Sequence, residues 1–165
     1  MRELLFVTLL TILATFNARA ETTFSPTNGP GCKDCSKPAF GYWVCPGPGG
    51  YAVAFMDEGN IAGLAIGPVR SVRKAAATAQ WLGANKVFGP KVQWIVRSGA
   101  PKAAVIRIWR RKDVDDPTEV EELAVYAIDG ESACAYAAID IHRPKANDLA
   151  LAPAEQAANS RCPTK

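Results

Sequence analysis

The sequence has little of what metal and phosphate chemistry require. Its 165 residues include a single histidine, His142, so a zinc site built from Cys32, Cys35 and Cys45 would lack a nearby fourth ligand. The sequence also has no glycine-rich phosphate loop that opens a helix, no alternation of strands with helices, and no internal repeat. We therefore expect neither a metal site nor a cofactor.

Long apolar runs are missing beyond residue 20. The first twenty residues combine Arg2, an apolar segment over 4–16 and the small-x-small triplet Ala18-Arg19-Ala20, which is the layout of a secretory signal peptide. The apolar segment is too short for a membrane-spanning helix, which needs about 20 residues. We predict cleavage after Ala20 and export to the periplasm or the extracellular space, without a membrane span.

The remaining chain is the size of one domain, and its pattern predicts an α+β fold. Residues 21–40 are rich in Ser, Thr, Pro and Gly and are expected to form an irregular N-terminal arm. A single domain over 41–165 is expected to hold an antiparallel sheet, one mid-chain helix over 71–83 and a C-terminal helix over 147–162 packed on the sheet. Short apolar runs predict about seven strands in sequential hairpins, over 42–45, 51–57, 61–67, 91–97, 103–112, 119–128 and 133–141.

Five cysteines follow the predicted cleavage point, and an exported protein meets an oxidising compartment, so disulfides are expected. Cys134 on a strand and Cys162 at the end of the following helix would meet when that helix folds back onto the sheet. Cys45 would pair with Cys35 or Cys32; we favour Cys35–Cys45 with Cys32 free, and the reverse is the alternative. A redox role for the C-x-x-C pair is disfavoured because no helix starts there. The odd cysteine would allow a covalent dimer.

Several segments resemble a group of small, exported, uncharacterised proteobacterial proteins. The Cys-Pro-Gly-x-Gly-Gly-Tyr segment is Cys45 to Tyr51 here, followed by a strand with Trp94, the stretch Ile106 to Trp109, and Cys134 with Tyr136. The resemblance covers most of residues 32–162. It implies a similar fold and disulfide framework and no particular activity.

Charge is the strongest unusual signal, although the formal net charge is only +3. Between Gly59 and Lys112 the chain has eleven Lys or Arg and no Asp or Glu, whereas residues 113–141 have nine Asp or Glu and no Lys or Arg. Cross-strand pairing of Arg110 with Glu121 and of Lys112 with Glu119 is the favoured explanation. The alternative is a basic face for an envelope protein or an anionic glycan or lipid, not nucleic acid, formed by Arg97, Lys102, Arg107, Trp109 and Arg111.

Asp140 and His142 share a strand face, so a carboxylate–imidazole pair is geometrically possible, although a surface histidine at the end of a strand is the favoured interpretation. A hydrolase would also need a nucleophile such as Ser98 or Ser132, and the sequence has no G-x-S-x-G motif. We therefore predict a non-enzymatic, disulfide-stabilised, exported binding module. The alternatives are a small secreted hydrolase that uses Asp140 and His142, and a structural envelope component without a specific ligand.

Overall fold

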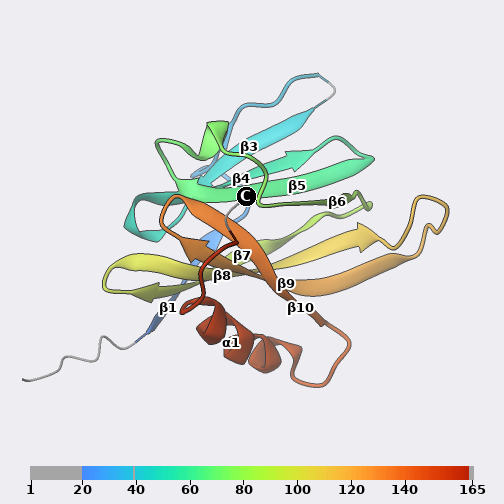
Figure 1. Ribbon diagram of the computed structural model, residues 1–165. Helices are drawn as coiled ribbons and strands as arrows, with labels where there is room; N and C mark the ends of the chain where they lie inside the picture. Colours follow the sequence, from blue (N-terminus) through green and yellow to red (C-terminus); the bar gives the residue numbers. More distant parts are fainter. Residues whose placement is uncertain (1–19, 39, 164–165) are drawn as a thin grey trace, which may run out of the picture.

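The computed structural model describes residues 20–38 and 40–163 (Figure 1). Residues 1–19 of the predicted signal peptide lie outside the described residues, so cleavage and export stay predictions. Among the residues that are described, no helix combines the length and the hydrophobicity needed to cross a membrane.

Two antiparallel five-stranded sheets replace the single sheet that the sequence predicts. The long sheet has the strand order β1-β7-β8-β9-β10, and the short sheet has the order β2-β3-β4-β5-β6. The prediction of antiparallel strands with a C-terminal helix is confirmed, but that of one sheet of about seven strands is wrong. The strands span Glu21–Pro26 (β1), Lys33–Asp34 (β2), Gly41–Pro46 (β3), Tyr51–Asp57 (β4), Ile61–Pro68 (β5), Ala79–Leu82 (β6), Phe88–Arg97 (β7), Ala100–Arg111 (β8), Glu119–Asp129 (β9) and Ser132–Asp140 (β10).

The N-terminal arm is not irregular at its start, because β1 pairs with β7 along one edge of the long sheet. Thr22 lies opposite Ile95, and Phe24 lies opposite Gln93. The segment has one large apolar residue and ends in Pro26, which suits an edge strand and gives little local strand signal. Its partner lies about 70 residues away, so only the tertiary fold shows that this segment is a strand.

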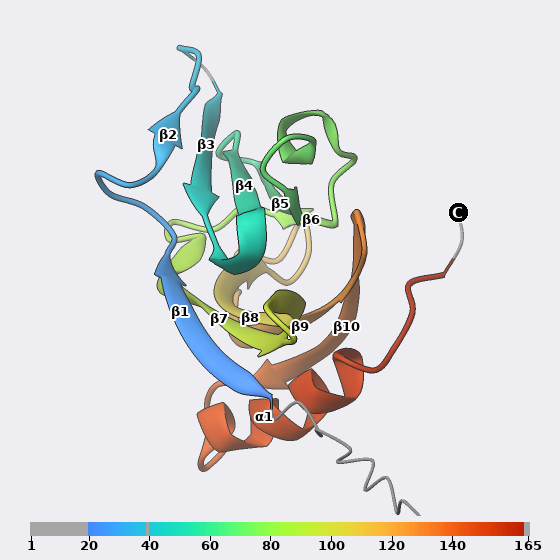
Figure 2. The ribbon, with the colours of Figure 1, turned by 90° about the vertical axis from the view of Figure 1, so that its left-hand side faces the viewer.

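The molecule has three layers, which Figures 1 and 2 show from two directions. The two sheets pack face to face, and the helix α1 (Ala146–Ala157) covers the other face of the long sheet. Alternate side chains fill the space between the sheets, where Trp94 and Ile106 of the long sheet meet Phe55 and Leu64 of the short sheet. This inter-sheet core is the main hydrophobic core of the fold.

Small residues hold α1 close to the long sheet. The buried residues of the helix are Ala146, Ala150, Ala154 and Ala157, which lie on one face at helical spacing. They pack against the sheet residues Val105, Leu123, Val125 and Ile139. The C-terminal helix is therefore confirmed, although it is shorter than the range 147–162.

The prediction of a mid-chain helix over 71–83 is wrong. Residues 71–83 form one 3₁₀ turn, Val72–Lys74, and then the strand β6, which pairs with β5. Val72 is buried on the outer face of the short sheet, whereas Ala75 and Ala76 are exposed. The alanines of this segment have helical spacing, but they offer too little apolar area to stabilise a helix against a core. The segment 79–82 therefore pairs with β5 as a strand.

Candidate functional site

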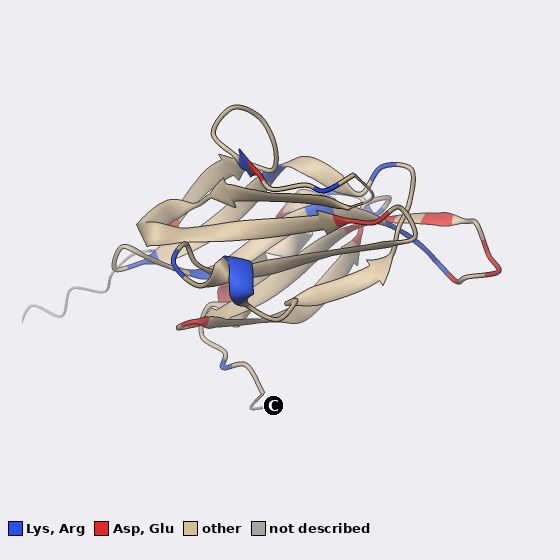
Figure 3. Ribbon diagram, turned by 90° about the horizontal axis from the view of Figure 1, so that it is seen from above, with Lys and Arg blue, Asp and Glu red and all other residues tan. Residues whose placement is uncertain are grey.

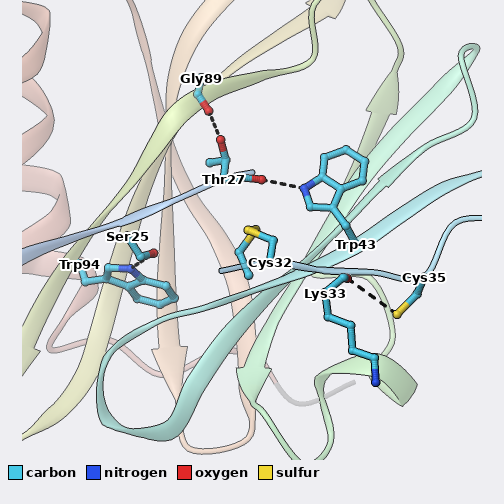
Figure 4. Close-up of a disulfide and its surroundings, with 9 residues drawn as sticks. Ser25, Thr27, Cys32, Lys33, Cys35, Trp43, Gly89 and Trp94 are labelled. Atoms are coloured by element: carbon cyan, nitrogen blue, oxygen red, sulfur yellow. Dashed lines mark hydrogen bonds between the residues drawn. A yellow bond between two sulfur atoms is a disulfide. The ribbon is translucent and has the colours of Figure 1, made fainter. Parts of the chain in front are cut away.

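The first disulfide joins Cys32 to Cys45, so the favoured Cys35–Cys45 pairing is wrong and the alternative is correct. The cause is the register of the β2–β3 hairpin. Lys33 lies opposite Val44, and one further step along the hairpin sets Cys32 opposite Cys45, with 4.2 Å between their Cα atoms. The side chain of Cys35 is an odd number of positions from Cys32, and alternation directs it to the other face of the sheet (Figure 4).

The second disulfide joins Cys134 to Cys162, the pair that the sequence predicts. It ties the segment after α1 to β10, at a separation of 28 residues. Cys35 is the free cysteine among the described residues, and it is half-buried. Its backbone N–H donates to the carbonyl oxygen of Tyr42 over 2.7 Å, while its thiol lies 3.8 Å from the carbonyl oxygen of Lys33.

The predicted basic face is not a single patch. Arg107, Trp109 and Arg111 do lie on one side of β8, because they occupy alternate positions. Arg97, however, donates to Asn159 beyond the C-terminal end of α1, and Lys102 lies near the start of β8. Figure 3 shows the basic positions dispersed over several elements.

Most of these arginines already have partners within the fold. Arg107 forms an ion pair with Glu121 over 3.1 Å, and Arg111 donates to the carbonyl oxygen of Gly83 over 3.0 Å. The ammonium of Lys86 lies 4.1 Å from the ring centroid of Trp109. Cross-strand pairing with an acidic residue therefore accounts for Arg107, whereas Arg111 bonds to a backbone carbonyl.

The expected pairs themselves are wrong by one residue. Arg110 lies opposite Val120 and pairs diagonally with Glu122 instead of Glu121, and Arg111, not Lys112, lies opposite Glu119. The β8–β9 turn is closed by the N–H of Lys112 donating to the carbonyl oxygen of Thr118. Because of this closure, the register of β8 and β9 differs by one residue from the register that the sequence predicts.

The carboxylate–imidazole pair exists, but it is a local surface feature. The Nδ1 atom of His142 lies 3.0 Å from Oδ1 of Asp140, which also accepts the backbone N–H of His142 over 2.9 Å. These hydrogen bonds lower the pKa of the Asp140 carboxyl. Both side chains are exposed; Ser132 lies at the opposite end of β10, and Ser98 in the turn after β7. The pair thus caps a turn and adjoins neither serine.

The strands β6 and β10 are edge strands of the two sheets and lie on the same side of the molecule (Figure 2). A cleft that the sequence does not predict lies between them. We call it the β6–β10 cleft. Its inner cavity has a volume of about 360 Å³. The polar and aromatic side chains in the wall of this inner cavity are Gln80, Trp81, Arg110, Glu122, Tyr126 and Tyr136.

The residues that line the inner cavity include an ion pair. Nε of Arg110 lies 3.2 Å from Oε1 of Glu122, and Nη2 lies 3.3 Å from Oε2, so the contact is bidentate. The Glu122 side chain is only 13% exposed. Both residues occupy positions that face the inter-sheet core, next in alternation after Ile108 and Ala124. The pair therefore ends the hydrophobic core and begins the wall of the cavity.

Tyr126 adds an unusual hydroxyl to the same wall. Its residue is 1% exposed, and its hydroxyl has no hydrogen-bond partner within the described part of the chain. No fully buried polar side-chain atom is left unsatisfied in the described part of the chain, so the hydroxyl oxygen keeps a small accessible surface, and Tyr126 is one of the residues that line the cavity. Burial, and to a lesser extent the charge of Glu122, raises the pKa of Tyr126, so the hydroxyl keeps its proton and can donate it.

Two aromatic side chains flank the cavity from opposite sheets. The indole N–H of Trp81 donates to the carbonyl oxygen of Trp109 over 3.0 Å, and its ring meets Phe88 edge-on at 5.6 Å. Tyr136 sits at a break in the β9–β10 register and is 40% exposed. Trp81 is thus a fixed wall, whereas Tyr136 extends from the bulged edge of β10.

An outer cavity of about 790 Å³ adjoins the inner one. Its wall includes hydroxyl and charged side chains, together with the Cys134–Cys162 disulfide. The polar side chains that line it include Ser71, Lys74, Thr78, Asp129 and Ser132. Thr78 accepts the N–H of Ile66 over 3.0 Å through its hydroxyl oxygen, which leaves the hydroxyl proton for another acceptor.

Comparison with known proteins assigns no family to the chain, since no family model, no curated protein and no solved structure matches it.

Proposed function

We propose that the chain is an exported, disulfide-stabilised, non-enzymatic binding module, and that its ligand binds in the β6–β10 cleft. The observation that carries this proposal is that Tyr126 lines the inner cavity together with Arg110 and Glu122, while its hydroxyl has no hydrogen-bond partner in the described part of the chain. Buried polar groups are nearly always hydrogen-bonded, so a ligand oxygen is a natural partner for this one.

The chemistry of the wall favours a neutral saccharide. Arg110 and Glu122 neutralise one another, and their remaining N–H groups and lone pairs can bind neighbouring hydroxyls of a sugar ring. Trp81 and Tyr136 offer ring faces to the apolar side of such a ring. A strongly anionic ligand would meet the half-hidden carboxylate of Glu122, so the anionic partner considered from the sequence fits this cleft poorly.

A peptide added as a strand is less suited to the same cleft. Strand addition requires a continuous row of free backbone groups along a sheet edge. The register of β10 shifts between Ala135 and Ala137, and β6 is only four residues long. Bulges and short strands are features that protect sheet edges from pairing. Recognition by side chains, as a saccharide needs, is therefore the better fit.

The covalent framework supports this role. One disulfide cross-links the β2–β3 hairpin and the other ties the segment after α1 to β10, as suits an oxidising compartment. The proposal keeps the signal peptide over residues 1–20 and the resemblance to small exported proteobacterial proteins. It places the saccharide partner in the cell envelope or outside the cell.

Replacement of Tyr126 by phenylalanine tests the proposal. The chain from Glu21 to Lys165 is screened against immobilised neutral glucans, mannans, galactans and chito-oligosaccharides, and the best binder is then titrated calorimetrically. We expect Tyr126→Phe to weaken binding about tenfold, because one ligand hydrogen bond is lost. The melting temperature should stay unchanged, because the hydroxyl bonds to no described residue.

Tyr42→Phe is the matched control. The hydroxyl of Tyr42 lies 3.5 Å from the carbonyl oxygen of Arg73, and Tyr42 is not among the lining residues of either cavity, so its removal should leave the affinity as in the wild type. Absence of binding to every saccharide in the screen, or equal affinities of wild type and Tyr126→Phe, would contradict the proposed function.

A further inference from the structure

The two cavities of the β6–β10 cleft adjoin without a gap on both walls. Along one wall, the outer cavity ends at Thr78 and the inner cavity begins at Ala79. Along the other wall, the outer cavity ends at Cys134 and the inner cavity begins at Ala135. Both walls therefore pass from the outer to the inner cavity in the direction of the chain, which places the two cavities end to end; we call the pair the trough.

The trough is longer than a single sugar ring needs. Its β10 wall extends from Ser132 to Ala138, which is about 20 Å at the usual rise of a strand. Small side chains, including Ala124, Ala135 and Ala138, are among the residues that line its inner end. The aromatic residues are confined to the inner end, and hydroxyl groups predominate at the outer end.

From this geometry we infer that the cleft binds one linear neutral oligosaccharide across two consecutive subsites. The inference rests on the proposed function and adds the length of the ligand to it. The inner subsite holds rings against Trp81 and Tyr136, while the outer subsite offers the hydroxyls of Thr78 and Ser132. The charged residues that line the outer cavity are Lys74, Asp129 and Glu131, and Glu131 is already paired with Arg70, so the outer subsite has no strong preference for an ionic ring.

The disulfide Cys134–Cys162 has a direct place in this arrangement. Both cysteines line the outer cavity, and Pro163 continues that wall beyond Cys162. The bond therefore fixes the C-terminal segment as part of the outer subsite and does not serve the core alone. The inner subsite has no residue from this segment in its wall.

Chain length is the variable that tests the inference. Calorimetric titrations with the mono-, di-, tetra- and hexasaccharide of the best-bound polymer should show affinity rising at least tenfold from disaccharide to hexasaccharide. A blocking variant, Ala75→Arg, places a long side chain in the outer cavity from an exposed position. It should reduce hexasaccharide affinity to that of the disaccharide and leave disaccharide affinity unchanged.

Val69→Arg is the charge-matched control, since Val69 is exposed on the preceding loop and is not among the lining residues of either cavity. It should bind all lengths as the wild type does. Equal affinity for disaccharide and hexasaccharide, or no effect of Ala75→Arg, would overturn the two-subsite inference and leave the proposed function standing. Binding of an extended peptide with no saccharide bound at any length would overturn both.

Discussion

Replacement of Cys32 by serine is expected to lower the free energy of unfolding by about 3 kcal/mol, because it opens a covalent loop with a sequence separation of 13 residues. Replacement of Cys35 is expected to change the free energy of unfolding by less than about 0.5 kcal/mol, because its half-buried thiol is not in a disulfide. Urea denaturation of both variants without reductant, compared with the wild type, measures the difference. The two variants carry the same cysteine-to-serine change at sites three positions apart, so each is a control for the other.

In the Cys32→Ser variant we do not expect Cys35 to form a disulfide with Cys45 in place of Cys32, because the side chains of Cys32 and Cys35 lie on opposite faces of the hairpin. Alkylation of the unfolded, unreduced wild-type chain should add one iodoacetamide group, and alkylation after reduction should add five. Serine at position 35 should remove the single adduct and any covalent dimer seen on a non-reducing gel. Destabilisation by Cys35→Ser with none by Cys32→Ser would show that Cys35 bonds to Cys45 and that the hairpin register is wrong.

The cysteine pairing shows where local pattern stops being informative. Alternation alone separates Cys32 from Cys35, since they differ by an odd number of positions, but it does not say which of them faces Cys45. That choice depends on the turn of the hairpin, where Lys37 and Phe40 form a bridge in the same register as Lys33 and Val44. A tight turn centred on that bridge would have predicted the observed bond.

Strands were easier to predict than their partners. The hairpins β4–β5, β7–β8, β8–β9 and β9–β10 follow from alternation and turn residues, because each pairing is local. Pairing of β1 with β7, and the division into two sheets, depend on contacts between distant segments. The prediction of a helix over 71–83 is wrong for the same reason. Ala79–Leu82 pairs with β5, and the spacing of the alanines does not indicate that pairing.

The candidate cleft was only partly within reach of the sequence. Arg110 and Glu122 continue the core-facing alternation of their strands, so an accurate register would have placed both at the edge of the core. Tyr126 reads as an ordinary core residue, because nothing local distinguishes a tyrosine that lines a cavity. Trp81 was assigned to a helix, and the cavity itself needs two sheet edges from distant parts of the chain.

Replacement of Trp94 by alanine is expected to destabilise the protein by about 3 to 5 kcal/mol, the range for a large aromatic residue removed from a core. Trp94 is 0% exposed and lies between the sheets. Its indole N–H donates to Oγ of Ser25 over 2.8 Å, and a Cβ atom at Gly47 would lie 2.5 Å from its ring. The variant therefore loses core contacts and the hydrogen bond that ties β1 to β7.

Trp109→Ala is the matched control on the same sheet. Trp109 lies on the opposite face of that sheet, partly exposed and in contact with Lys86, so its removal should cost no more than about 2 kcal/mol.

Because Trp94→Ala has a large expected effect, Trp94→Phe provides a folded intermediate case, with an expected loss of about 1 to 2 kcal/mol from the missing hydrogen bond and reduced volume. Thermal and urea unfolding of the three variants rank these effects. If Trp109→Ala were as damaging as Trp94→Ala, Trp94 would have no special place in the core, and the inter-sheet packing that forms the cleft would be wrong.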